Sequence, residues 1–103
     1  MRIHQFMDVF RSHHIEENTD PDRSEFTEIG ASSISEFGWI TGDRARTCPT
    51  SSLDRRQSQV LRNKDIVLCF RGSPESFGKV GLYRSKKGEI AIPNQSFVIL
   101  RQK

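Results

Sequence analysis

The chain has 103 residues, of which 34% are apolar and 28% are charged. A chain of this length forms one small domain, and its balance is polar for a globular protein without reaching the composition of a disordered one. Its apolar runs fall far short of the ~20 residues of a membrane-spanning helix, and no signal-peptide-like segment follows Met1. We therefore expect a single soluble domain over residues 1–103, located in the cytoplasm, with no membrane partner.

Charge is divided unevenly along the chain. Residues 1–36 contain three Arg against eight Asp and Glu, whereas residues 37–103 contain 13 Lys and Arg against five acidic residues. A basic body is typical of a protein that binds a polyanion such as nucleic acid. A solvated surface with uneven charge is the alternative.

The acidic lead-in, residues 1–20, begins with an apolar stripe. Four apolar residues recur at i, i+3, i+4 and i+7, the spacing of one helix face: Ile3, Phe6, Met7 and Phe10. A breaker cluster at residues 18–22 ends the pattern. We expect an N-terminal amphipathic helix that packs on the sheet of its own domain or, alternatively, holds two copies of the chain together.

The histidines and cysteines do not form a metal-binding pattern. His13 and His14 are adjacent, so on a helix their side chains point about 100° apart, and His4 is almost three turns from His14. The two cysteines are Cys48 and Cys69, and Cys69 lies inside an apolar run. We expect no metal site, and a buried free thiol rather than a disulfide.

Residues 25–40 read as a strand followed by turns. Alternation around Phe26 predicts a short strand that bends at Gly30, and residues 32–35 predict a turn or a short helical turn. We expect Trp39 to pack in the core. Stacking on a nucleic-acid base is the alternative for this side chain.

Residues 41–59 are the most polar part of the chain and are rich in arginine. The planar guanidinium fork suits bidentate contact with phosphate or with a guanine edge. We expect a long binding loop, because the segment is longer and richer in arginine than a connector requires. The alternative is a solvated loop whose Arg–Asp pairs contribute little.

Three short apolar runs dominate residues 65–101, and each is bounded by Gly, Pro, Ser or Asn. They are residues 66–70, 80–83 and 97–100, with a further candidate strand near 89–92. This pattern predicts strands and turns, and the glycine-hinged loop from Arg71 to Lys79 predicts a hairpin. The expected fold class is α+β: a small, mostly antiparallel twisted β-sheet or partly open barrel with an N-terminal amphipathic helix.

A string of short motifs runs through the same region. It comprises Leu61–Leu68, Arg71-Gly72-Ser73, Gly78-Lys79-Val80-Gly81 and Ala91–Phe97, preceded by Phe37-Gly38-Trp39-Ile40. This string resembles the target-recognition domains of type I restriction–modification specificity subunits, and a related pattern occurs in the C-terminal parts of some N6-adenine DNA methylases. The resemblance covers residues 25–101, and Lys64 stands where the family usually has Gly before Asp. It implies a β-rich recognition body without catalysis.

The motifs of catalysis are missing from the sequence. A Walker A loop needs four residues between its glycines and a Ser or Thr after Lys, whereas five residues separate Gly72 from Gly78 and Val80 follows Lys79. No paired acids suggest a metal-dependent nuclease, and every His lies within residues 4–14. The cofactor loop and the Asn/Asp-Pro-Pro-Tyr-type motif of a methylase are also absent. We expect no enzymatic activity and no cofactor.

Together these patterns predict a non-catalytic module that binds double-stranded DNA, alone or within a larger methylase or restriction assembly. Cations would contact phosphates while Arg, Gln or Ser side chains read base edges. The candidate DNA-binding residues are Arg44, Arg46, Arg55, Arg56, Arg71, Lys79 and Gln95. The alternative is a protein-interaction or homodimerisation module that uses the N-terminal stripe Ile3, Phe6, Met7 and Phe10.

Overall fold

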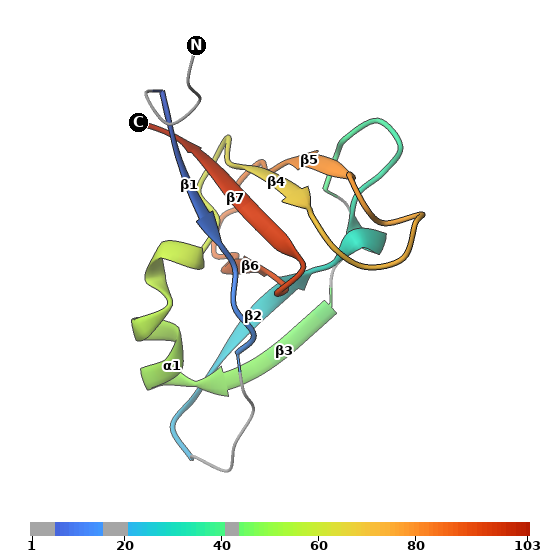
Figure 1. Cartoon of the computed structure of the whole chain (residues 1–103). Coiled ribbons are helices and arrows are strands. Elements are labelled where there is room, and N and C mark those ends of the chain that lie inside the picture. The colour runs from blue at the N-terminus through green and yellow to red at the C-terminus, as the bar shows by residue number, and fades with distance from the viewer. Residues whose placement is uncertain (1–5, 16–20, 41–43) are drawn as a thin grey trace.

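Strands dominate the molecule, because its apolar runs are short, rich in β-branched residues and separated by Gly, Pro and Ser. The computed structural model describes residues 6–15, 21–40 and 44–103 (Figure 1). In chain order the elements are β1 (Met7–Arg11), β2 (Arg23–Ile29), the 3-10 turn η2 (Ala31–Ser33), β3 (Arg44–Pro49), α1 (Thr50–Arg55), the 3-10 turn η3 (Gln57–Gln59), β4 (Ile66–Cys69), β5 (Val80–Leu82), β6 (Ala91–Pro93) and β7 (Phe97–Gln102).

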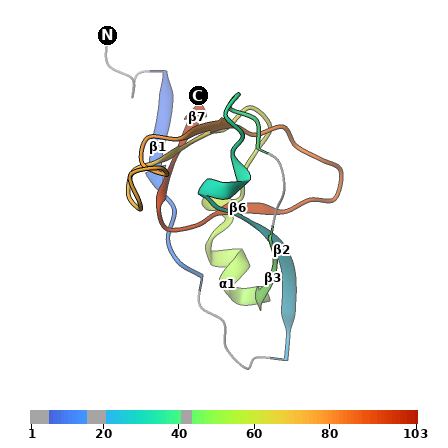
Figure 2. The same cartoon turned by 90° about the vertical axis from the view of Figure 1, so that its right-hand side faces the viewer.

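The strands form two sheets. The four-stranded sheet has the order β1-β7-β4-β5 and is antiparallel throughout. The three-stranded sheet has the order β3-β2-β6, in which β2 runs antiparallel to β3 and parallel to β6. Figure 2 shows β1 on one side of the molecule and β2 and β3 on the other, with β6 and α1 between them.

Two clusters of buried side chains hold these layers together. The first lies under the four-stranded sheet and includes Val67, Phe97 and Ile99, all of which are fully buried. The second lies between the three-stranded sheet and α1 and includes Phe26 and Leu53. Burial of apolar side chains is the main stabilising contribution to folding, so these clusters fix the position of α1 against the strands.

The predicted N-terminal amphipathic helix is wrong for the described residues. Residues 7–11 form β1, which pairs with β7 along its whole length, and Phe10 packs against the first core cluster. Backbone pairing with the edge of a sheet overrides a helical spacing that rests on only four apolar residues. The helix expected to carry the interface stripe is thus not present in the described residues: Phe6 is 55% exposed, Met7 is a strand residue, and Ile3 lies outside the described residues.

The expectation of a long loop over residues 41–59 is also wrong for residues 44–59. This segment folds into β3, α1 and η3, whereas residues 41–43 lie outside the described residues. Buried Cys48 and Leu53 anchor it to the three-stranded sheet. Its four arginines lie on either side of these anchors, so the few apolar positions that define the strand and the helix gave no periodic pattern.

Several other local predictions are confirmed. β4 and β5 form the antiparallel hairpin, and Gly72 and Gly78 adopt positive φ values of 126° and 85° in its loop. The short helical turn appears as η2, directly after Gly30. Cys48 and Cys69 are both buried free thiols. The expectation of a core position for Trp39 is wrong, since this side chain is 42% exposed.

Candidate nucleic-acid interface

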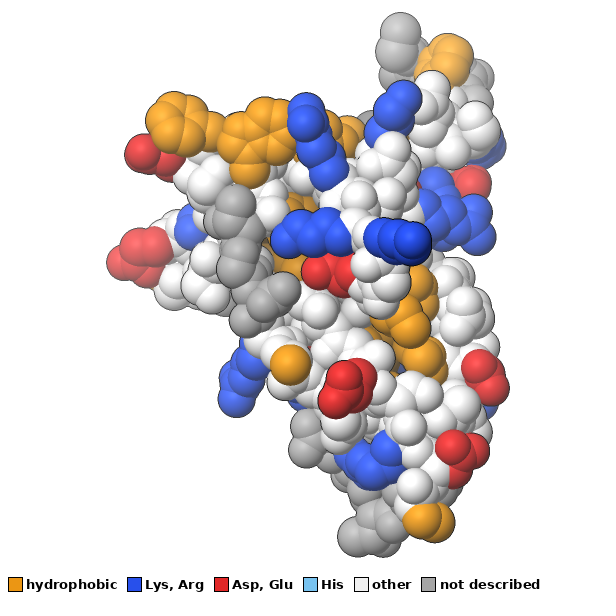
Figure 3. All heavy atoms as spheres, turned by 180° about the vertical axis from the view of Figure 1, so that it is seen from behind, with side chains coloured by type: hydrophobic (Ala, Val, Ile, Leu, Met, Phe, Trp, Pro, Cys, Tyr) orange, Lys and Arg blue, Asp and Glu red, His pale blue; other side chains and the backbone are white. Residues whose placement is uncertain are grey.

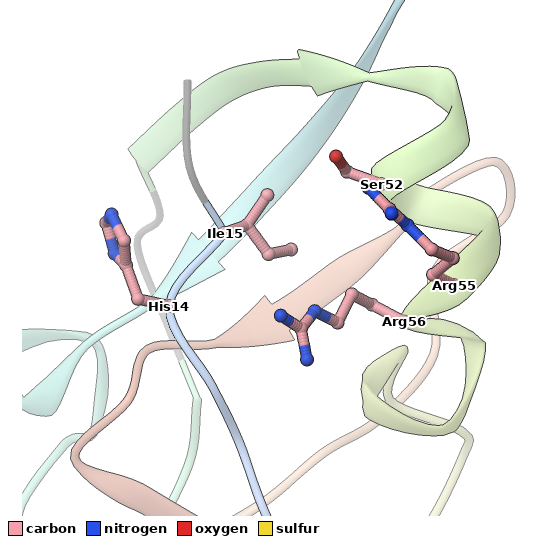
Figure 4. Close-up of a pocket in the computed structure, with 5 residues that line it drawn as sticks. All are labelled: His14, Ile15, Ser52, Arg55 and Arg56. Carbon is pink, nitrogen blue, oxygen red and sulfur yellow. The ribbon is translucent and has the colours of Figure 1, made fainter. Parts of the chain in front are cut away.

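A pocket of about 340 Å³ opens where the segment after β1 passes α1. It is lined by His14, Ile15, Ser52, Arg55 and Arg56. Figure 4 shows the Arg56 guanidinium reaching away from the end of α1 toward the segment that carries Ile15. The described residues that line the pocket include no carboxylate, and they supply hydrogen-bond donors and positive charge, a suitable environment for an anion.

The start of α1 is fixed to the start of β2. Thr50 donates its backbone N–H to the Asp22 carbonyl at 3.0 Å, and the hydroxyl groups of Thr50 and Ser24 lie 2.8 Å apart. Leu53 is buried in the second core cluster. These contacts leave Arg55, which is exposed, and the half-buried Arg56 at the C-terminal end of the helix, beside the pocket.

Buried Gln59 holds the other wall of the pocket in place. Its Oε1 accepts hydrogen bonds from the Ser12 hydroxyl at 3.1 Å and from the His13 backbone N–H at 2.6 Å. Gln59 belongs to η3, which follows α1 directly. One amide side chain therefore fixes the segment of residues 12–15 against the element that carries Arg55 and Arg56.

A second group of cations surrounds Phe70, at the end of β4. The guanidinium carbons of Arg11 and Arg71 lie 5.0 and 5.1 Å from the centroid of the Phe70 ring. Arg71 also donates from Nη2 to the Gln95 backbone carbonyl at 3.1 Å. Cation–π contact and this hydrogen bond orient two exposed guanidinium groups on one face without neutralising their charge.

The two groups are joined by the segment after β1. A small pocket has His14, Gln95 and Glu28 among its lining residues, and His14 also lines the α1 pocket. We call the surface that carries both groups the basic face. Its members are Arg11, His14, Arg55, Arg56, Arg71 and Gln95.

Three predicted DNA-binding residues lie away from the basic face or are engaged in packing. Arg44 is exposed at the end of β3 that is farther from α1. Arg46 forms an ion pair with Glu28, packs over Phe26 and donates to a backbone carbonyl. Lys79 donates from Nζ to the carbonyl of Ala31 at 3.2 Å, which connects the hairpin loop to η2.

The charged positions within the motif string have structural roles. Asp65 is buried and accepts hydrogen bonds from Nε and Nη2 of Arg101, at 3.0 Å to Oδ1 and 2.7 Å to Oδ2. It also accepts the Arg62 backbone N–H at 2.8 Å. This arrangement closes the turn before β4 and connects it to β7. Lys64, in the same turn, has a φ of 74°, a conformation that favours glycine.

Sequence reasoning missed Arg11 and His14 as members of the basic face. Both were assigned to a helix, on which no contact with Phe70 or with α1 could be foreseen. Proximity of these residues to Arg71 and Arg55 depends on the pairing of β1 with β7, which is a non-local property. The sequence shows an excess of Lys and Arg over residues 37–103, but this excess does not tell which of these cations lie close together.

The pKa shifts belong to groups away from the basic face. Burial raises the pKa of the Cys48 thiol, and the charges of Arg23 and Arg46 partly oppose this. Burial also raises the pKa of the Tyr83 hydroxyl, which donates to Glu89 at 2.6 Å. Hydrogen bonds from its own backbone N–H and from Ser73 lower the pKa of Glu75. Each cause is a local packing or turn contact.

Comparisons with known proteins add no relative. A scan against protein-family models and a search of curated proteins found no match for this chain. In the part of the chain that the structure describes, no helix is long and apolar enough to cross a membrane, and no group of three or more His, Cys, Asp or Glu side chains is placed to hold a metal ion. The geometry of the basic face therefore carries the functional argument.

Proposed function

We propose that this protein is a non-catalytic, cytoplasmic module that binds double-stranded DNA through the basic face. The observation that carries the proposal is the convergence of four guanidinium groups from three separate segments: Arg11 and Arg71 around Phe70, and Arg55 and Arg56 at the α1 pocket. Cations on one continuous surface provide the sequence-independent part of DNA affinity, because they displace counterions from phosphates.

The two ends of the basic face suit different contacts. Among its described lining residues the α1 pocket offers two arginines and a serine hydroxyl, groups that typically bind backbone phosphate, and no carboxylate. Arg71 and Gln95 project from adjacent loops, and both side-chain types form bidentate contacts with base edges in the major groove. We therefore assign phosphate positioning to Arg55 and Arg56, and base reading to Arg71 and Gln95.

The resemblance to restriction–modification target-recognition domains supports the same function. The family's usual glycine falls at Lys64, where the backbone adopts the left-handed conformation that glycine accommodates best. Asp65, the next residue, forms an ion pair with Arg101, so both motif positions stabilise the fold. The module would then serve a larger methylase or restriction assembly that supplies catalysis.

Charge-matched substitutions test the assignment. Replacing Arg55 and Arg56 together with Ala should weaken binding to a fluorescein-labelled DNA duplex about tenfold or more at low salt, since two phosphate contacts are lost. The matched control replaces Arg62 and Lys87, two exposed cations in turns away from the basic face, and removes the same charge. Fluorescence anisotropy measures both dissociation constants.

The comparison between the two double variants decides the outcome. DNA binding through the basic face is supported if the control variant binds within about twofold of the wild type while the Arg55/Arg56 variant binds more weakly. Equal weakening of both variants would mean that net charge alone governs binding, and no binding of the wild type at low salt would overturn the proposal. Circular dichroism confirms that each variant is folded.

A further inference from the structure

The outer face of the four-stranded sheet carries a continuous apolar surface. Strand register places five side chains in one row across the sheet, and their order is Val9, Leu100, Ile66, Leu82 and Trp39. A second row runs from Arg11 through Val98 and Leu68 to Val80. Directly paired residues lie on the same side of a sheet, so both rows face outward together.

Burial confirms which side of the sheet these rows occupy. Phe97, Ile99 and Val67 alternate with the row residues along β7 and β4 and are fully buried. The row residues are half-buried or exposed, with Val9 at 47% and Val80 at 50% exposure. An antiparallel sheet with one solvated face normally presents polar side chains there, so a second apolar face calls for a covering layer.

No described element provides that layer. Figure 2 shows the four-stranded sheet at the side of the molecule, with α1 and the three-stranded sheet on its inner side. Beyond β5 the surface continues onto the segment of residues 37–40, because Leu82 donates its N–H to the Gly38 carbonyl at 2.9 Å. Figure 3, from behind, shows exposed hydrophobic side chains gathered at that corner beside Lys or Arg side chains.

The charged side chain among the paired strand residues of this face is an arginine, and a second arginine lies at the far edge. Arg11 lies on the edge strand β1, and Arg84 lies at the opposite edge, with its guanidinium carbon 4.2 Å from the centroid of the Trp39 ring. The paired residues that share this face along β1, β7, β4 and β5 include no Asp or Glu. The surface thus has an apolar centre with a cation at each edge.

We propose that this outer apolar face docks an amphipathic helix of a partner protein whose rim is acidic. The four strands and the bridged segment at Trp39, at a spacing of about 4.8 Å, make a surface roughly 20 Å wide, which accommodates a helix about 10 Å in diameter with side chains on both flanks. The apolar stripe of the helix covers the two rows. Carboxylates on its flanks reach Arg11 on one side and Arg84 on the other, as in helix-in-groove recognition.

Charge separates this occupant from a second copy of the chain. Two such faces placed against one another would bring four arginines together with no carboxylate from either face, an arrangement that like-charge repulsion disfavours. An acidic helix meets the same cations with complementary charge. The apolar residues of the docking surface lie outside the basic face, and the two surfaces share Arg11 at their border.

A synthetic peptide pair tests the proposal. The probe is a labelled 18-residue amphipathic helix with a Leu stripe and Glu on both flanks, and the comparison peptide has Lys in place of Glu. We expect the Glu peptide to bind at least about tenfold more tightly than the Lys peptide, and Val9→Glu with Val80→Glu to weaken its binding at least about tenfold. Arg84→Glu should weaken it and reduce its salt dependence.

Controls distinguish docking on this face from non-specific hydrophobic binding. Phe77→Ser removes a side chain that is 65% exposed but lies in the hairpin loop, and it should leave peptide affinity unchanged. Amide chemical-shift changes on addition of the Glu peptide should map to β1, β7, β4 and β5.

The proposal is overturned if the Glu peptide does not bind or if the chemical-shift changes map elsewhere. It is also overturned if the face instead drives self-association in sedimentation or binding to anionic vesicles. Val9→Ser with Val80→Ser, which adds no charge beside Arg11, should leave DNA affinity unchanged.

Discussion

Lys64 shows how a single backbone conformation connects the sequence to the fold. Its φ of 74° lies in the left-handed region, and it is the non-glycine residue with a positive φ in the described chain. A side chain in this region costs about 1 kcal/mol relative to glycine. The neighbouring Asp65, buried and paired with Arg101, fixes the turn strongly enough to retain this strain.

Replacement of Lys64 with Gly should therefore stabilise the protein, by about 0.5–1 kcal/mol, because relief of strain outweighs the added freedom of the unfolded chain. Lys87→Gly is the matched control, since Lys87 is an exposed lysine without a positive φ. This control should be neutral or slightly destabilising. Urea denaturation measures the free energy of unfolding of both variants. A Lys64→Gly variant that is less stable than the wild type would contradict the presence of backbone strain at Lys64.

Tyr83 makes stability depend on alkaline pH. Its pKa is raised by burial and by Glu89, so the folded protein keeps the phenolic proton at a pH where the unfolded chain, with a Tyr pKa of about 10, releases it. Stability from this group is complete below pH ~10 and declines above it. Tyr83→Phe should cost about 1 kcal/mol at pH 7, through the lost hydrogen bond to Glu89, and should flatten the decline above pH 10. Urea denaturation at pH 7 to 11 shows both effects, and an unchanged alkaline slope would refute the assignment.

Among the secondary-structure elements, those held by contacts between residues near in sequence could be predicted, and those held by distant pairing could not. The β4–β5 hairpin could be predicted from its apolar runs and from glycines that the loop requires, because all of these signals are local. β1 could not, because its identity depends on pairing with β7 some 90 residues later in the sequence. The same long-range pairing assembles the basic face, so the sequence suggested Arg55, Arg56, Arg71 and Gln95 as candidates but not the arrangement that joins them.

Gln59 is the contact on which this arrangement most depends. Gln59→Ala would leave the Ser12 hydroxyl and the His13 N–H without their shared acceptor, and should destabilise the protein by about 1–3 kcal/mol. It should also weaken DNA binding under conditions where the variant is fully folded, because residues 12–15 lose their anchor beside α1. The control is Gln102→Ala, at an exposed position of β7. Thermal denaturation measures the stability and fluorescence anisotropy measures the DNA affinity. Undiminished DNA affinity would show that Gln59 does not position the DNA-binding residues.

The whole molecule presents two surfaces of different chemistry. The basic face combines guanidinium groups with few apolar side chains, whereas the outer face of the four-stranded sheet is apolar between two arginines. They meet at Arg11, which belongs to both. A module with separate surfaces for DNA and for a protein helix would be able to hold a duplex while it is attached to a larger assembly.

The salt dependence of DNA binding tests the central claim most directly. Three guanidinium–phosphate contacts, from Arg11, Arg55 and Arg56, should give a slope of log Kobs against log salt concentration of about −2.7, at about −0.9 for each contact. The Arg55→Ala, Arg56→Ala variant should reduce the magnitude of the slope by about 1.8, to about one third of its value. Anisotropy titrations of one duplex between 50 and 200 mM salt, about the range over which such contacts lose most affinity, provide the measurement. A wild-type slope near zero, or a slope that the double substitution leaves unchanged, would contradict DNA binding through the basic face.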